Sequence, residues 1–461
     1  MMELMPFLLF IAICVVLLAG YPVAFTLAGT SLAFAGIGVL TGTFDASFLN
    51  AIPNRIYGNI IANTTLFAVP MFVFMGVMLE KSRIAEDLLN GMTLLFGKMR
   101  GGLGLSVIIV GMLLAASTGI VGATVVTMGV LSLPTMLKAG YQPSLATGTI
   151  CATGTLGQII PPSIALVLLG DVMSTAYQQA QIDMGIFSTQ TVSVGDLFSG
   201  AIVPGLLLVL FYSVYMLGMA IFKPEFAPPA KQEDIDAIKA SSSIMEQVLK
   251  SLLPPLLLII SVLGSILFGV ATPTEAAGVG GLGAILLALA KRQLSLSILR
   301  EVSIATAKVS SMIYMILIGA GIFSLVFRGF SGDVLVENIF QSLPGGEIAA
   351  IVLVMLVVFL LGFILDFIEI TYMVVPIVGP ILLAMGFDPV WLGIMLAVNL
   401  QTSFLTPPFG FALFYLRGAA PDKVLTSDIY KGVIPFIIIQ LIMLLLLALW
   451  PELTTWLPSL L

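Results

Sequence analysis

The chain alternates long apolar runs with short polar segments. Four of these runs, at residues 6–20, 252–268, 350–365 and 433–449, contain no Asp, Glu, Lys or Arg. Runs of about 20 apolar residues are long enough to cross a bilayer as helices. Membrane barrel strands instead show alternating segments of about ten residues, and these runs are continuously apolar. The pattern therefore predicts an all-α polytopic membrane protein.

Composition supports the membrane assignment and narrows the chemistry. Hydrophobic residues make up 59% and charged residues 9% of the chain, against about 25% charged in soluble domains. Histidine is absent, and Cys14 and Cys151 lie in apolar runs, which disfavours a disulfide, a zinc site or a histidine base. There is no GxxxxGK[ST] motif for ATP. We expect no enzyme, no cofactor and no nucleic-acid partner.

The positions of the basic residues predict how the chain crosses the membrane. Basic residues gather on the cytoplasmic side, and one topology places there all of the 18 basic residues except Arg55 and Arg328. In it both termini are outside, and two segments enter and leave on the same side. Crossing helices are then expected at about 5–20, 22–43, 62–80, 252–269, 273–290, 309–327 and 433–450.

An internal repeat relates the two halves of the chain. Five residues recur 246 positions later: Pro134, Gly140, Pro143, Pro161 and Pro162 match Pro380, Gly386, Pro389, Pro407 and Pro408. The repeat divides the chain into residues 1–222 and 251–461, joined by a polar cytoplasmic segment at 223–250. Since the two copies enter from opposite sides, the repeat is inverted, an arrangement from which secondary transporters build a site at the bilayer midplane.

Each half is expected to contain a re-entrant hairpin followed by a broken helix. The hairpins are placed at about 101–138, entering from the cytoplasm, and at about 345–386, entering from outside. The broken helices are placed at about 143–175 and 390–417. Paired prolines remove backbone N–H groups and break a helix, and freed carbonyls persist at membrane depth where they line a cavity or hold an ion. A simple proline kink is the alternative.

The breaks and hairpin tips supply the candidate binding residues. Small size and oxygen ligands at the first tip suit Na⁺, although close helix packing would favour the same residues. The candidates are Ser117, Thr118, Gly119 and Gly122 at the first tip, Thr153, Gly154, Gly157, Gln158, Pro161, Pro162 and Ser163 at the first break, Asp366 and Thr371 at the second tip, and Asn399, Gln401, Thr402, Ser403, Thr406, Pro407 and Pro408 at the second break.

Sodium is expected to bind backbone carbonyls and hydroxyls close to six of these positions. The six are Ser117, Gly119, Gly157, Asp366, Thr402 and Thr406. The second tip is placed at residues 365–371, where Asp366 and Glu369 are ionisable groups at membrane depth and therefore costly unless paired or functional. Asp366 is expected to matter more, because Glu369 lies nearer the side where a helix can face water.

Two other charged residues have competing interpretations. Glu275 follows Thr272 by three residues with Pro273 between them, the spacing of a capping box at a helix start. We therefore interpret Glu275 as structural rather than functional. Arg328 is a cation on the outer side that could attract an anionic substrate or dock a partner, and a solvated helix end is the equal alternative.

Several short motifs together resemble a known family. PMFVFMG at 70–76, STGIVGA at 117–123, GQIIPPS at 157–163, ATPTEAAG at 271–278 and TPPFG at 406–410 resemble the large membrane subunit of tripartite ATP-independent periplasmic (TRAP) transporters. The resemblance extends over nearly the whole chain. It implies an elevator-type fold similar to the ion transporter superfamily, in which the hairpins and broken helices slide against a scaffold in the bacterial inner membrane.

The resemblance also implies what is transported and with which partners. It implies Na⁺-coupled uptake of an organic acid, such as a sugar acid or dicarboxylate, with a small four-helix membrane subunit and a periplasmic substrate-binding protein. An ion channel also uses re-entrant segments, and a carboxylate carrier could work without a binding protein. An intramembrane enzyme is the third class, and it lacks the usual catalytic side chains.

Overall fold

The computed structural model describes residues 4–238 and 244–461, and in this part every regular element is helical. The all-α prediction is confirmed there. Eight described helices are long and apolar enough to cross a membrane, and a ninth span is possible if the bent pair α17 (Phe367–Met373) and α18 (Val375–Ala384), at 58° to each other, counts as one. Lys239, which the predicted topology places in the cytoplasm, lies outside the described residues.

The described part of the first half, residues 4–222, forms ten α-helices. They are α1 (Met5–Leu18), α2 (Val23–Thr41), α3 (Ile52–Ile56), α4 (Ala68–Lys81), α5 (Ile84–Phe96), α6 (Gly102–Thr118), α7 (Val121–Ala139), α8 (Pro143–Thr155), α9 (Ile164–Asp183) and α10 (Val194–Phe222). Short 3₁₀ or π turns join some of them: η2 (Ala46–Ala51), η3 (Tyr57–Ile61), η4 (Thr64–Phe67) and η5 (Leu156–Gln158).

The connecting segment contains α11 (Gln232–Ile238), and the second half continues to the C-terminus. Its elements are α12 (Ile244–Leu267), α13 (Pro273–Ala290), α14 (Leu296–Gly329), α15 (Gly332–Ser342), α16 (Gly346–Leu361), α17 (Phe367–Met373), α18 (Val375–Ala384), α19 (Pro389–Leu405), α20 (Phe411–Ala419), α21 (Thr426–Leu449), α22 (Glu452–Thr455) and η6 (Pro458–Leu460). Large apolar side chains remain exposed along α12 and α21, as expected for surfaces that face lipid.

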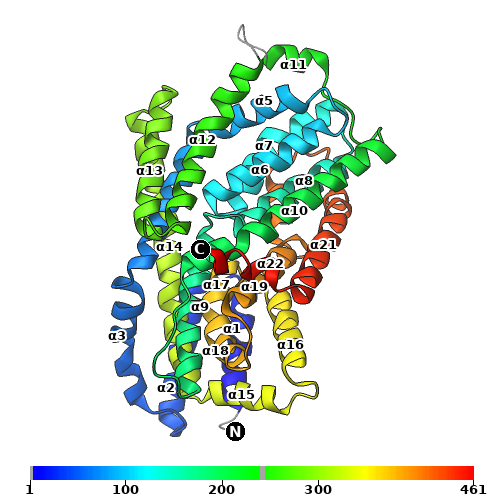
Figure 1. Cartoon of the computed structure of the whole chain (residues 1–461). Coiled ribbons are helices and arrows are strands. Elements are labelled where there is room, and N and C mark those ends of the chain that lie inside the picture. Colours follow the sequence, from blue (N-terminus) through cyan, green and yellow to red (C-terminus); the bar gives the residue numbers. More distant parts are fainter. Residues whose placement is uncertain (1–3, 239–243) are drawn as a thin grey trace.

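The two helical hairpins extend from opposite ends of the molecule. Helices α6 and α7 lie in the upper half of Figure 1, whereas α16 and α18 lie in the lower half. Gly140 after α7 and Gly386 after α18 both adopt positive φ, at +97° and +98°, and the next helices begin at Pro143 and Pro389. The residues that define the sequence repeat therefore terminate and start equivalent helices in the two halves.

Hairpins and broken helices from both halves pack into one body, here called the hairpin body (α6–α10 and α16–α22). The second part of each broken helix packs on the hairpin of the other half: α9 contacts α18, and α20 contacts α7. Helix α21 packs along α8, and α10 contacts α6, α19 and α21. The hairpin body is consequently interlocked, because neither half completes its own packing alone.

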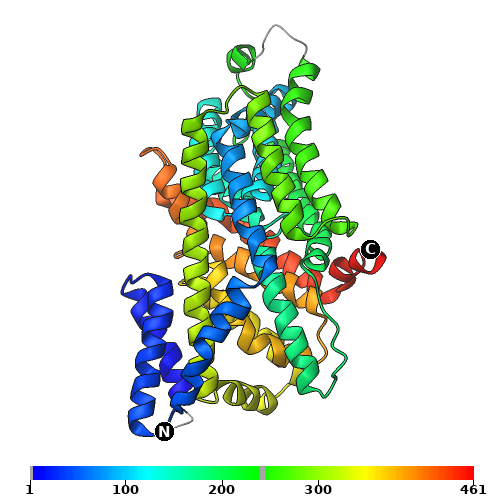
Figure 2. The same cartoon turned by 90° about the vertical axis from the view of Figure 1, so that its left-hand side faces the viewer.

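The remaining long helices form a second group, here called the scaffold (α1–α5 and α12–α14). Helix α4 packs on α13, α2 on α14, and α5 on α12. Figure 2 shows α14 as the long yellow-green helix that runs the height of the molecule. The scaffold touches the hairpin body mainly where α4 and α5 meet α6 and where α14 meets α17.

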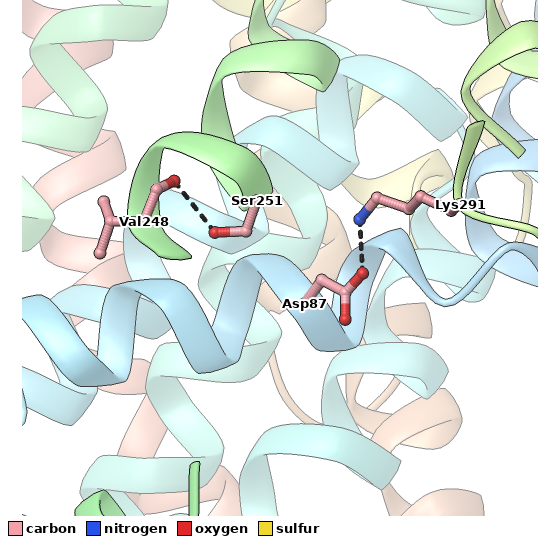
Figure 3. Close-up of polar contacts among 4 residues, drawn as sticks. All are labelled: Asp87, Val248, Ser251 and Lys291. Carbon is pink, nitrogen blue, oxygen red and sulfur yellow. Dashed lines mark hydrogen bonds and ion pairs between the residues drawn. The ribbon is translucent and has the colours of Figure 1, made fainter. Parts of the chain in front are cut away.

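Two contacts attach helix α5 to its scaffold neighbours α12 and α13, and Figure 3 shows the Asp87–Lys291 ion pair of one and the Ser251 hydroxyl that takes part in the other. Asp87 on α5 forms an ion pair with Lys291, directly after α13. Gly91 faces α12 so closely that a methyl group added to it would come within 2.2 Å of the Ser251 hydroxyl. That hydroxyl donates to the Val248 carbonyl at 3.1 Å. Absence of a side chain at Gly91 therefore permits the close approach of α5 and α12.

The structure corrects several element boundaries expected from the sequence. Helix α14 begins at Leu296, so Arg300 and Lys308 lie on a helix rather than in a polar loop before residue 309. Helix α9 continues to Asp183, eight residues beyond the expected end at 175. Helices α5 and α15 were not expected; Figure 1 shows α5 near the top and α15 at the bottom. The N-terminus lies at the bottom, opposite α11, and the C-terminus lies at mid-height (Figures 1 and 2).

Candidate functional site

The first hairpin turns where the sequence predicts its tip. Helix α6 ends at Thr118, Gly119 adopts φ +59°, and α7 begins at Val121. The Ser117 hydroxyl donates to the Leu113 carbonyl at 2.8 Å. The Thr118 hydroxyl donates to its own helix and lies 2.6 Å from the Thr124 hydroxyl. The tip therefore presents the C-terminal end of α6, whose last carbonyls favour a cation.

The first tip lies directly over the first helix break. A methyl group at Gly119 would come within 2.8 Å of the backbone nitrogen of Ile164, the first residue of α9. Gly157 approaches the hairpin in the same way, since its added methyl would lie 3.3 Å from the Ala115 carbonyl oxygen. Glycine at these two positions allows the tip and the break to touch through their backbones.

Polar side chains organise the first break, which lies between α8 and α9. Ser163 caps α9 by accepting from the Leu166 N–H at 3.4 Å, and its hydroxyl donates to the Gly157 carbonyl at 2.7 Å. The Pro161–Pro162 peptide bond is cis. Within the described part of the chain, the side-chain oxygen of buried Gln158 has no hydrogen-bond partner. It is a free acceptor beside the break.

The second tip turns earlier than predicted. Helix α16 ends at Leu361 and α17 begins at Phe367, so the turn spans residues 362–366 instead of 365–371. The Asp366 carboxylate accepts from the Phe367 N–H at 2.7 Å, and the Glu369 carboxylate accepts from the Asp366 N–H at 2.9 Å. This is a capping box, in which two acidic side chains satisfy N–H groups at a helix start.

Glu369 is buried, with 6% of its surface exposed, whereas Asp366 is half-buried. The predicted route from Glu369 to water is therefore wrong: the cap draws its side chain back toward the tip. Thr371 is fully buried, and its hydroxyl has no hydrogen-bond partner among the described residues. Of the two tip carboxylates, Asp366 is the more exposed.

Tyr415 on α20 packs against the first tip and lies near the charges of the second, and no sequence pattern indicates this role. A methyl group at Gly122 would come within 2.9 Å of the Tyr415 ring. The same tyrosine lies close to the charges of Asp366 and Glu369. Tyr415 therefore lies against the first-half tip and within electrostatic range of the second-half tip, although 244 positions separate Gly122 and Asp366 in the chain.

The second break resembles the first in its polar organisation. The Thr402 and Thr406 hydroxyls donate to the Val398 and Thr402 carbonyls at 2.7 and 2.8 Å. Gly410 N–H donates to the Thr406 carbonyl at 3.0 Å, and the Pro407–Pro408 bond is cis. Ser403 touches the second tip, because a methyl group at Gly362 would lie 2.1 Å from its hydroxyl. Each break therefore lies against the hairpin tip of its own half.

Four predicted residues face the interior of the hairpin body instead of a tip. Thr153 packs against Gly111 on α6, and Gly154 packs against Val125 on α7. The Asn399 amide donates to the Met355 carbonyl of α16 at 2.7 Å. Gln401 is fully buried next to the Tyr212 hydroxyl, which itself accepts from Gln440 at 2.7 Å. These side chains hold the broken helices against their neighbours.

The arrangement can hold a cation through backbone and hydroxyl oxygens. In the described ranges, no group of three or more His, Cys, Asp or Glu side chains could hold a metal ion. The first tip and break instead place the end of α6 next to Gly157, and the second tip and break place the turn before Asp366 next to Ser403. Oxygen ligands of this kind suit hard cations.

Relatives of known function cover almost the whole chain. The large permease protein DctM of the C4-dicarboxylate TRAP transporter of Vibrio cholerae serotype O1 is 29% identical over 98% of this chain and 97% of its own. The large permease protein SiaM of the sialic acid TRAP transporter of the same organism is 29% identical, with 96% of each chain covered. The ectoine/5-hydroxyectoine TRAP transporter permease UehC of Ruegeria pomeroyi is 28% identical, with 98% of each covered.

The fold and the family agree with these relatives. A crystal structure of the YdaH transporter of Alcanivorax borkumensis, described as having an unusual topology, superposes with a TM-score of 0.64 at 14% identity, covering 97% of this chain and 98% of that one. The family model for the DctM component of the tripartite ATP-independent periplasmic transporter matches residues 10–453. This multi-pass membrane protein therefore belongs to the DctM family of TRAP transporter large permeases.

Proposed function

We propose that this protein catalyses Na⁺-coupled secondary uptake of an organic acid across the bacterial inner membrane. The main support is that hairpin tips from opposite ends of the molecule meet two helix breaks inside the hairpin body. This body packs against the separate scaffold. The two tip-and-break pairs have inverted orientations within one body. A binding site formed by them for an ion and a substrate can therefore open to either side of the membrane. The free energy of the Na⁺ gradient then drives accumulation.

The coupling ion is assigned to the tips and breaks. Carbonyl oxygens near Gly119 and Gly157 and near Thr402 and Thr406 supply neutral ligands, and Asp366 supplies charge. Sliding of the hairpin body along the scaffold would carry this site between the two sides, which is an elevator mechanism. The division into halves at 1–222 and 251–461, with both termini in the periplasm, follows the sorting of basic residues.

The substrate class and the partners follow the family. Two of the relatives are named for C4-dicarboxylate and sialic acid, both organic acids. We assign this chain a small four-helix membrane subunit and a periplasmic binding protein that delivers the substrate. The observed exposed apolar surfaces on α12 and α21 leave room for lipid and for a membrane subunit.

The test is uptake in proteoliposomes that contain this chain, its membrane subunit and its binding protein. An inward Na⁺ gradient should drive accumulation of the acid that the binding protein carries, and ATP should have no effect. Equal uptake in K⁺ medium without Na⁺ would contradict the proposed Na⁺ coupling. Counterflow of labelled substrate separates a carrier from a channel, and omission of the binding protein tests the carrier that works without one.

A further inference from the structure

A cavity of about 520 Å³ lies between the scaffold and the hairpin body, away from the tips. The scaffold contributes α3, η3 and α14, and the hairpin body contributes α9, α17 and α18. None of the tip or break residues predicted to bind ligands lines it. Its volume falls in the range of small-molecule sites, about 300–1,000 Å³.

Two arginines face this cavity without a carboxylate partner. Arg55 on α3 and Arg328 near the end of α14 are both half-buried and both line the cavity. Neither forms an ion pair within the described ranges. Among the described residues, Arg328 donates a hydrogen bond to the Pro376 carbonyl at 3.4 Å, and its charge lies close to that of Arg55 on the same cavity wall. Two adjacent, unneutralised guanidinium groups favour an anion between or beside them.

The positions of these arginines in the predicted topology also favour an anion site. They are the two basic residues that the predicted topology leaves on the outer side. Cations there work against the usual charge distribution, and partly buried cations in membrane proteins mark ligand pathways. The structure adds that both face a single cavity, although 273 residues separate them.

The one acidic side chain on the described cavity wall is held by two neutral residues of the same wall. Asp171 on α9 accepts from the Asn63 amide at 2.8 Å and from the Tyr372 hydroxyl at 3.5 Å. Its carboxylate is therefore held by these two groups rather than by the arginines. Thr175 and Gln179 add further polar groups on the same helix. Such neutral groups suit the hydroxyls and amides of an organic acid.

We propose that this cavity is a second anion site, in which Arg55 and Arg328 bind the carboxylate of a small organic acid. The inference rests on the proposed function in one respect: the acid bound here is the transported one, held on the outer side before it reaches the tips. Because the walls come from both bodies, movement of the hairpin body along the scaffold would change the cavity and release the acid.

Chemical protection of the arginines tests the site without any transport. The complete transporter in nanodiscs is treated with phenylglyoxal, and modification of each arginine is measured by mass spectrometry with and without succinate, gluconate or N-acetylneuraminate. At least one of these carboxylates should slow the modification of Arg55 and Arg328 at least fivefold. Arg300, exposed at the other end of α14, is the matched control and should react at the same rate throughout.

Each other outcome overturns the proposal. Lack of protection by every carboxylate would show that the cavity does not bind small acids. Equal protection by sulfate would show recognition of charge alone. A copurifying phospholipid that is seen by native mass spectrometry in the wild type but lost from Arg328→Gln would assign the cavity to a lipid headgroup.

Substitutions connect the site to transport and separate the two proposals. In proteoliposomes, Arg55→Gln and Arg328→Gln should each raise the KM for the substrate at least tenfold, with Arg300→Gln unchanged. Protection of the arginines without Na⁺-driven uptake would leave the anion site standing and reject the proposed function. Na⁺-driven uptake without protection of the arginines would support the proposed function and reject the anion site.

Discussion

At the scale of single residues, the carboxylates at the second tip combine a structural role with a predicted functional one. Asp366 and Glu369 close a capping box, as Thr272 and Glu275 do at the start of α13. An N-cap side chain contributes about 1 kcal/mol to stability. Loss of either carboxylate can therefore lower transport simply by loosening the tip, so a useful substitution must keep the cap and remove only the charge.

Asp366→Asn is that substitution. Asparagine retains an oxygen that can accept from the Phe367 N–H, so the thermal unfolding midpoint should stay near that of the wild type. Uptake should fall at least tenfold, because Asp366 is the more exposed of the two tip carboxylates and the one proposed to supply charge to the ion site. Asp366→Ala should lose uptake and also about 1 kcal/mol of stability. Normal uptake and normal Na⁺ dependence in Asp366→Asn would reduce the carboxylate to a cap.

Glu369→Gln provides the comparison. The glutamine also keeps an acceptor for the Asp366 N–H, and Glu369 is buried, with 6% of its surface exposed. Its uptake should fall less than that of Asp366→Asn, by about threefold or less. A loss as large as that of Asp366→Asn would show that both charges take part in transport.

The two capping boxes also show which side-chain roles can be predicted from residue spacing. The spacing of Thr272 and Glu275 predicts a cap, and the structure confirms it, with the Thr272 N–H donating to Glu275 at 2.8 Å. Asp366 and Glu369 have the same spacing, yet two acids at membrane depth favour a functional interpretation. The side-chain directions that settle the cap depend on the turn at residues 362–366, which spacing alone does not place.

At the scale of helices, glycines fix how closely the scaffold approaches the first tip. A methyl group at Gly76 on α4 would come within 2.6 Å of the Ser117 carbonyl oxygen and 2.7 Å of the Thr118 Cα. These are backbone atoms, so the tip itself must shift to make room. Overpacking of this kind typically costs about 1–3 kcal/mol.

Gly76→Ala should therefore lower uptake at least tenfold and lower the thermal midpoint. Gly36→Ala on α2 is the matched control, because no atom lies within 4 Å of an added methyl group there. That control should keep full uptake and gain about 0.5–1 kcal/mol from better helix propensity. Equal behaviour of the two variants would mean that α4 and the tip are not in tight contact in the working protein.

The attachment of α5 to α12 allows a rescue experiment. A methyl group at Gly91 would meet the Ser251 hydroxyl at 2.2 Å but the Ser251 Cβ only at 3.3 Å. Gly91→Ala should lower the thermal midpoint, and the added change Ser251→Ala should restore most of it. Additive losses in the double variant, measured by thermal unfolding of the purified protein, would exclude this contact as the cause.

Proline and glycine made the main elements predictable, whereas amphipathic helices were missed. The starts at Pro143 and Pro389 and both helix breaks follow from residues whose backbone effect is local. Helices α5 and α15 have 13 and 11 residues and are too short to cross a membrane. These two helices form because they pack against other helices, and a search for long apolar runs does not detect such packing.

At the scale of the whole molecule, the predicted topology places α11 and the loop after α9 on opposite sides of the membrane. After replacement of Cys14 and Cys151, single cysteines at Phe187 and Gln232 report each side, and both positions are exposed. An impermeant thiol reagent should label Phe187→Cys in whole spheroplasts and Gln232→Cys only after disruption. Labelling of both before disruption would rule out the inverted topology.

The contact between the two bodies gives the sharpest test of sliding. Asn63, directly before η4 in the scaffold, donates to Asp171 on α9 of the hairpin body at 2.8 Å. If the hairpin body moves along the scaffold, this contact must break in each cycle. A covalent link at the same place should therefore hold the transporter in one state, whereas a protein with fixed bodies should tolerate it.

Paired cysteines at Asn63 and Asp171, joined by a short bifunctional thiosulfonate, supply that link. Uptake by the double variant should fall to background after cross-linking and return when the link is reduced. The single variants Asn63→Cys and Asp171→Cys, treated with the same reagent, control for modification and for loss of the hydrogen bond. Binding of substrate should survive in the linked protein, because the link stops movement and leaves the tips intact. Uptake that continues unchanged in fully cross-linked protein would reject the elevator and favour a gate confined to the hairpin tips.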